Sequence, residues 1–203
     1  MNYPAFFDKV PAIQLQDQLS NFLGAFEEGK MEISYLDCVK LAGHSCPTVA
    51  GAYMMAVKGL EALYPDGELP QRGAVEISMR DGEADGVTGV TCNVISFIIG
   101  ANGLSGFKGI GGNFARDNLV NYNVLMDGEV KLTRLATDES VILSYDPSII
   151  PADPEMKSLM MKSLQCKSCV EENEEFGKLW QARVEKILLS RDLWDQMLTI
   201  KKG

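Results

Sequence analysis

Apolar positions recur at helical spacing in several stretches of the chain. Before residue 30 they predict one or two amphipathic helical pieces, built on Leu15, Leu19, Phe22, Leu23 and Phe26. Residues 34–43 have the same spacing, and residues 155–203 are predominantly helical, with an apolar stripe opposite charged positions. The stretch from Pro47 to Leu63 is apolar almost all round, and a proline suits a first helical turn, so it predicts a buried helix.

Alternating and β-branched stretches predict strands between these helices. Residues 74–79, AVEISM, and residues 140–147, SVILSYDP, each predict one strand. Residues 119–136 alternate on both sides of Asp127-Gly128, a pair typical of hairpin turns, and therefore predict an antiparallel hairpin. Residues 87–100 are ambiguous, because their β-branched residues favour a strand while their length allows a buried helix.

The helices and strands do not alternate strictly. The mixture predicts an α+β fold, with a largely antiparallel sheet packed with helices, a buried central helix that starts at Pro47 and a helical C-terminal segment. Three prolines, Pro147, Pro151 and Pro154, end the strand-rich part. We therefore expect an α+β core domain over residues 1–150 and a helical extension over residues 151–203.

Composition and charge limit the function classes. Among 203 residues, 46% are hydrophobic and 23% are charged, which is ordinary for a globular protein. A net charge of −9 argues against nucleic acid as a partner, because its phosphates attract clustered Lys and Arg. The chain has no apolar run long enough to span a membrane, and its N-terminus lacks the basic and apolar regions of a signal peptide. We therefore expect a cytoplasmic protein that does not bind membranes.

Five cysteines, an odd number without an export signal, argue against a disulfide framework. Such thiols are core residues, ligands or nucleophiles. Two of them form the motif CKSC, Cys166 to Cys169, which suits a shared metal ion or a redox disulfide. A zinc ribbon needs two such pairs, so the motif is either half of a four-cysteine site across a twofold axis or a remnant without metal.

The segment Gly43-His44-Ser45-Cys46-Pro47 holds the only histidine. If Pro47 opens a helix, Cys46 falls near the N-cap, where unpaired N–H groups and the helix dipole favour a thiolate. Thiolate sulfur and imidazole nitrogen are preferred zinc ligands and also suit iron, nickel or copper. One alternative is a satisfied polar histidine beside a buried core cysteine. Another is Cys46 as a nucleophile with His44 as its base.

A third donor would strengthen the metal hypothesis. Cys92 is the leading candidate, because it begins a buried-looking segment just after a turn-rich stretch. With His44 and Cys46 it would leave one coordination position open to water or substrate, as in catalytic or ligand-binding metal sites. Cys38, six residues before His44, is either a further donor or a core residue.

Six glycines between Gly100 and Gly112 indicate a close approach of the backbone to a ligand, a strand or a second subunit. The stretch matches neither of the common phosphate-loop motifs. Lys108 and Arg116 flank it and are candidates for holding an anionic group of a cofactor or ligand. The alternative is a tightly turned connection against the core helix.

The stretch AGHSCPTVAGAYMMAVKGLEAL, residues 42–63, resembles the opening of the FmdE family, which is named for a component of formylmethanofuran dehydrogenase. Members carry Gly-His-x-Cys-Pro before a long helix rich in small residues. The similarity continues through AVEISM, the cysteine of GVTCNVISFIIGANG and SGFKGIGGN, over roughly residues 35–125. Two positions depart from the family pattern, Ala42 in place of a second histidine and Thr48 in place of glycine.

The resemblance implies an α+β core, a homodimer and a metal, usually taken as zinc, bound by His44, Cys46 and Cys92. We therefore expect a metal-binding protein whose open site binds a small-molecule ligand or passes the metal onward. One alternative is a metal-dependent enzyme, with Glu76, Asp81 or Asp85 as acid or base. Another is a protein that binds a haem or pterin-type cofactor. The family name reflects operon association and establishes no reaction, so catalytic residues stay unassigned.

Overall fold

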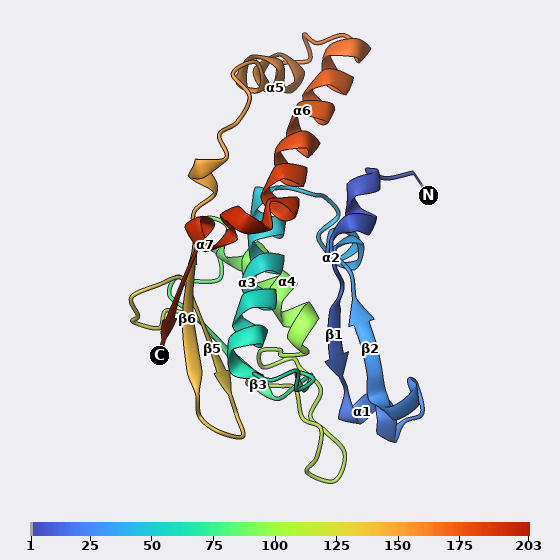
Figure 1. Ribbon diagram of the computed structural model, residues 1–203, viewed down its shortest axis with the longest axis vertical. Coiled ribbons are helices and arrows are strands. Elements are labelled where there is room, and N and C mark those ends of the chain that lie inside the picture. The colour runs from blue at the N-terminus through green and yellow to red at the C-terminus, as the bar shows by residue number, and fades with distance from the viewer. Residues whose placement is uncertain (1) are drawn as a thin grey trace.

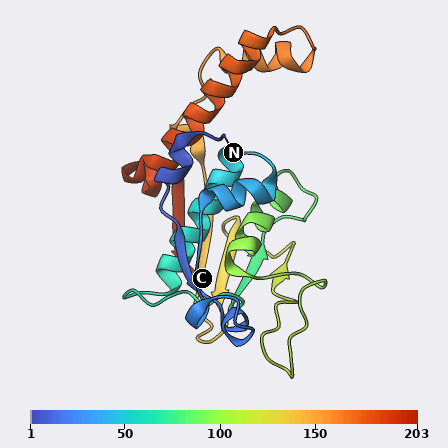
Figure 2. The same ribbon diagram turned by 90° about the vertical axis from the view of Figure 1, so that its right-hand side faces the viewer.

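The main sheet has five strands in the order β4-β3-β5-β6-β7. The structure, a computed structural model, describes residues 2–203 (Figures 1 and 2). The strands are β3 (Val75–Met79), β4 (Val120–Asn121), β5 (Val130–Arg134), β6 (Ser140–Tyr145) and β7 (Leu198–Lys202). Only the β3–β4 pair is parallel within this sheet. The predicted α+β class with a largely antiparallel sheet is confirmed.

Helix α3 (Pro47–Leu63) is the centre of the molecule and begins where the sequence predicts. It contacts β6 of the sheet and helix α4 (Thr88–Ile99), so the ambiguous residues 87–100 form a helix. Its residues are buried nearly all round, as predicted. Gly51 allows a close approach to the sheet, because a Cβ there would collide with the ring of Tyr145.

Residues 2–33 differ from the predicted helices. They form an antiparallel pair of strands, β1 (Ile13–Gln16) and β2 (Lys30–Ile33), with the short helix α1 (Gln18–Phe22) between them. Ile13 and Leu15 are buried while Gln14 is exposed, which is a strand's period of two. Phe22 and Leu23, counted toward a helical stripe, are each 62% exposed and belong to no buried face.

The predicted hairpin around Asp127-Gly128 is wrong. Residues before this turn lie beside β3, where β4 pairs in parallel, while β5 pairs with β3 and β6. Asn118 and Asn123 adopt positive φ angles and limit β4 to two residues. The sequence alternates over residues 119–136, but the backbone before Asp127 is interrupted by these positive φ angles. It therefore cannot form the long strand that a hairpin requires.

The C-terminal residues contain the helices α5 (Met156–Leu164), α6 (Val170–Leu189) and α7 (Trp194–Met197). Figures 1 and 2 show α5 and the outer part of α6 projecting from the body, and we call residues 156–189 the α5–α6 arm. The final strand, β7, returns to the main sheet beside β6, so the predicted helical segment ends in a strand. The domain boundary at residue 150 stays a prediction.

The remaining helix is α2 (Tyr35–Ala42), as predicted for residues 34–43. Short 3₁₀ helices lie at Ala5–Lys9, Glu27–Gly29, Pro147–Ile149 and Arg191–Leu193. Within residues 2–203, every helix is either too short or too polar to cross a membrane.

Candidate functional site

The turn between α2 and α3 separates His44 from Cys46. His44 is exposed, and its Nδ1 lies 3.0 Å from the carbonyl oxygen of Ala42. Cys46 is 8% exposed and is the N-cap of α3, as predicted, with its Sγ accepting the Val49 N–H at 3.4 Å. The chain changes direction between these residues, so His44 faces solvent and Cys46, two positions later, faces the core.

Helix α6 holds this turn in place. Trp180 Nε1 and Gln181 Nε2 both donate to the carbonyl oxygen of Ser45, at 2.9 and 3.1 Å. The Ser45 hydroxyl in turn lies 2.9 Å from the hydroxyl of Tyr35. Hydrogen bonds from two separate elements thus fix the backbone that presents His44.

The buried cysteines have different surroundings. Cys92 lies on α4, 1% exposed, with its Sγ 3.7 Å from Ser96 Oγ and hydrogen-bonded to the Tyr122 hydroxyl. Burial raises the pKa of the Cys92 thiol, which these hydrogen bonds only partly offset. Burial raises the pKa of Cys38 to about 12, so this thiol is a protonated core residue at neutral pH.

The three predicted metal donors are not brought together. Across residues 2–203, no group of three or more His, Cys, Asp and Glu side chains is placed to hold a metal ion. His44 faces solvent, Cys46 caps α3 from within the core, and Cys92 hydrogen-bonds Tyr122. This donor set does not fit a three-ligand metal centre, and zinc or another transition metal stays a prediction. Cys166 and Cys169 are exposed in the α5–α6 arm.

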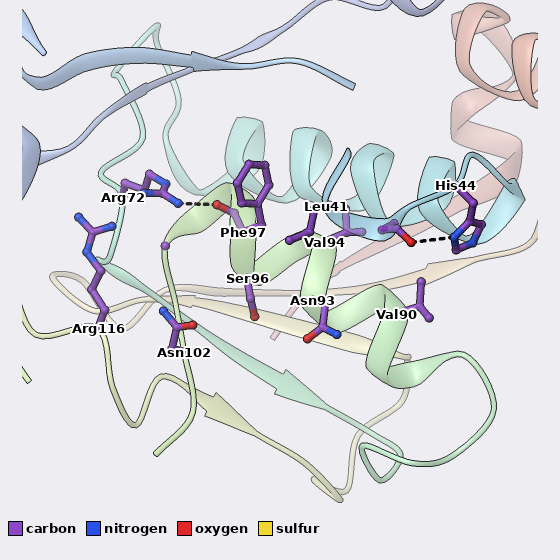
Figure 3. Close-up of a pocket in the computed structure, with 12 residues that line it drawn as sticks. Leu41, His44, Arg72, Val90, Asn93, Val94, Ser96, Phe97, Asn102 and Arg116 are labelled. Carbon is purple, nitrogen blue, oxygen red and sulfur yellow. Dashed lines mark hydrogen bonds between the residues drawn. The ribbon is translucent and has the colours of Figure 1, made fainter. Parts of the chain in front are cut away.

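A pocket of about 460 Å³ lies between α2, α4 and the glycine-rich segment. We call it the α2–α4 pocket; its lining residues are Leu41, Ala42, His44, Arg72, Val90, Asn93, Val94, Ser96, Phe97, Gly100, Asn102 and Arg116. Figure 3 shows His44 at one end of this pocket and Arg72 and Arg116 at the other, with α4 side chains between them. The predicted residues His44 and Arg116 therefore share one pocket.

Two arginines and one aspartate form the basic end of the pocket. Asp17, only 3% exposed, accepts hydrogen bonds from Arg116 at 2.5 Å and from Arg72 at 3.2 Å. Burial alone would raise the pKa of Asp17, but hydrogen bonds from Arg116, the Ser20 N–H and Arg72 outweigh it and lower the pKa. The cluster carries two positive charges against one negative charge.

Gly100 lets both arginines approach the end of α4. Its φ of 73° is left-handed, and a Cβ there would lie 2.8 Å from Arg72 Cγ and 2.9 Å from Arg116 Nη1. Arg72 also donates to the α4 carbonyls of Phe97 at 2.6 Å and Ile98 at 3.0 Å. The glycine-rich segment was predicted to approach a ligand, a strand or a second subunit, and at Gly100 it instead approaches two arginine side chains.

Lys108, the other predicted anion-binding residue, does not line the pocket. Its Nζ donates to Asp117 at 2.8 Å and to the carbonyl of Leu104 at 2.7 Å. Sequence reasoning missed Arg72, Asn93 and Asn102. Asn93 and Ser96 are polar positions three apart in an apolar segment, which indicates one helix face once that segment is known to be helical. Arg72 lies in a loop whose turn residues gave no such pattern.

A second cavity of about 500 Å³, which Glu83 and Tyr122 line, shares Asn93, Ser96 and Asn102 with this pocket. The carboxylates considered as acid or base lie elsewhere. Asp81 and Asp85 line a separate cavity of about 440 Å³, where Asp81 pairs with Arg80 and Asp85 accepts the Gly82 N–H. None of them lines the pocket that contains His44.

Comparisons with known proteins do not identify the chain. No model of a known family matches it, and no curated protein matches it. The resemblance to the FmdE family stays a prediction based on the GHSCP segment and the stretches that follow. The proposed function therefore depends on the geometry of the pocket.

Proposed function

We propose that the chain binds a small anionic molecule in the α2–α4 pocket. The observation that carries this proposal is the charge at its basic end, where Arg72 and Arg116 face the single buried carboxylate of Asp17. One positive charge remains uncompensated in a chain whose net charge is −9. A carboxylate or phosphate group of a ligand would complete the cluster, since guanidinium groups bind both well.

Arg116 is the residue best suited to hold that group. Arg72 uses Nε, Nη1 and Nη2 for Ile98, Asp17 and Phe97. Among the described residues, Arg116 donates only from Nη2, to Asp17, which leaves Nε and Nη1 for a ligand. A hydrogen bond to a charged group contributes about 1.5–3 kcal/mol.

His44 lies at the end of the α2–α4 pocket opposite the two arginines. With the proton on Nδ1 donated to Ala42, the Nε2 atom of the neutral ring is a free acceptor. Asn93 and Asn102 lie between the two ends and offer amide donors and acceptors. The ligand we propose therefore has an anionic group near Arg116 and a polar, hydrogen-bond-donating group near His44.

Isothermal titration calorimetry with inorganic phosphate, small dicarboxylates and phosphate monoesters tests the proposal. The variant Arg116→Lys keeps a cation for Asp17 but removes the extra donors, and we expect affinity to fall about tenfold, or 1.4 kcal/mol. The matched control is Lys108→Met, which removes a charge outside the pocket and should leave affinity unchanged. Equal losses in both variants would show that the loss of affinity is not specific to the pocket and would overturn the proposal. Because His44 is exposed, the variant His44→Ala should fold as the wild type does. A loss of affinity in this variant would therefore reflect binding and not folding.

Metal binding is the second candidate, favoured by the orientation of His44. Metal-ligating histidines usually donate their other ring N–H to a carbonyl or carboxylate, as Nδ1 is placed to do here. Because no three protein donors converge in residues 2–203, ligand atoms would have to complete the coordination. Metal analysis of protein purified without added metal should show less metal in His44→Ala. Equal metal content in the wild type and this variant would remove His44 as a ligand.

A further inference from the structure

The turn between α5 and α6 contains two cysteines that the proposed pocket does not use. Cys166 and Cys169 are both free and exposed, whereas Cys38, Cys46 and Cys92 are buried. Figure 1 shows the turn that joins α5 and α6 at the outer end of the arm. Only this pair of thiols is therefore open to reagents from solvent among the cysteines.

Hydrogen bonds already close the turn around the two cysteines. The backbone of Cys166 donates to Ser163 at 3.0 Å, and that of Lys167 donates to Lys162 at 2.9 Å. The hydroxyls of Ser163 and Ser168 both lie 2.8 Å from Asn173 Oδ1. The two cysteines are therefore held within one hydrogen-bonded turn, which lowers the entropy cost of joining them.

The position of Cys169 favours its use as the attacking thiol. Cys169 is the N-cap of α6, a helix of 20 residues, where the helix dipole stabilises negative charge. The carboxylates of Glu171 and Glu172 both lie beside the Cys169 side chain, and the ammonium of Lys162 pairs with Glu172 at 2.6 Å, so one of the two carboxylates is compensated. Cys166 lies three residues earlier, in the turn, with a positive φ of 54°.

We propose that Cys166 and Cys169 form a reversible dithiol–disulfide pair, oxidised by low-molecular-mass disulfides such as oxidised glutathione. The Cys169 thiolate attacks one glutathione sulfur, which forms a mixed disulfide and releases one glutathione thiolate. The Cys166 thiolate then attacks the Cys169 sulfur, forms the intramolecular bond and releases the second glutathione thiolate. The two cysteine protons pass to the released thiolates, so the protein loses two electrons and oxidised glutathione gains two.

The test equilibrates the full chain in buffers with different ratios of reduced to oxidised glutathione, followed by acid quenching, alkylation and intact-mass measurement. We expect the wild type to lose two thiols in one transition, without retained glutathione, and peptide mapping to join Cys166 to Cys169. The variants Cys166→Ser and Cys169→Ser should instead each retain one glutathionyl group. At millimolar reduced glutathione, half-oxidation of the wild type should need about tenfold less oxidised glutathione than half-modification of either variant.

Three results would overturn the proposal. The first is a wild type that keeps both thiols in fully oxidised glutathione. The second is a wild type that accumulates mixed or intermolecular disulfides in place of the internal bond. The third is a wild type whose half-oxidation needs as much oxidised glutathione as half-modification of the serine variants. Because both cysteines are exposed in the arm, the serine variants should fold as the wild type does, which circular dichroism checks.

Discussion

The body around α3 and the α5–α6 arm contain similar apolar residues, but the body buries them and much of the arm exposes them. Leu132, on β5, is fully buried against α3, whereas Leu164, at the end of α5, is 73% exposed. Twelve of the 17 residues of α3 are buried, while only Met156 is buried in α5. The difference indicates that α5 contributes little to stability, whereas the inner part of α6 belongs to the core through Val184, Ile187 and Leu188. The outer part of the arm is therefore free to present its side chains to solvent or to another molecule.

The largest expected effect in the body comes from Asp17, because within residues 2–203 this buried carboxylate is the only acidic partner of two arginines at the end of α4. Replacing it, as Asp17→Asn, should lower the free energy of unfolding at neutral pH by about 3–5 kcal/mol. The matched control is Asp127→Asn, which removes a carboxylate that is 90% exposed although it pairs with Lys201. That change should cost less than about 1 kcal/mol.

Acid should remove the same contribution in the wild type. The pKa of Asp17 is lowered in the folded state, so its stabilisation is complete above its ordinary value of 3.8 and is lost as pH falls through the lower, folded value. Chemical denaturation between neutral and strongly acidic pH measures this slope. The slope should be shallower in Asp17→Asn, and equal slopes in the two proteins would show that Asp17 is not the titrating group.

The next effect compares two leucines directly. Leu132→Ala should lower the free energy of unfolding by about 2–5 kcal/mol, because it leaves a cavity between β5 and α3. Leu164→Ala removes the same atoms from an exposed side chain and should change it by less than about 0.5 kcal/mol. Urea denaturation of both variants gives the difference, and similar losses would mean that the arm is covered in solution.

The elements that the sequence predicted correctly are those whose pattern is long and whose boundaries carry a chemical marker. Helix α3 has a proline at its start and an apolar surface over 17 residues, so its position and burial followed from the chain. The strands β1 and β2 span four residues each, and their period of two is too short to distinguish from helical spacing. The paired register of β4 depends on β3, which lies about forty residues earlier in the chain.

The candidate site divides in the same way into predictable and unpredictable parts. The N-cap position of Cys46 followed from Pro47, because capping is a local property. The approach of Arg72 to Arg116 was not predictable, since Asp17, Arg72 and Arg116 come from three distant parts of the chain. Nor did the sequence indicate that His44 and Cys46 would face solvent and core, because that depends on where α6 binds the turn.

The pairing of β7 with β6 attaches the arm to the main sheet at both of its ends. The arm leaves the sheet after β6 and the chain comes back to the neighbouring strand, so the arm is anchored at both of its roots. A proteolytic cut at residues 165–169 would therefore release neither half, because α5 stays joined to β6 and α6 stays joined to β7. Nicked protein should migrate as one particle under native conditions and as two fragments after denaturation.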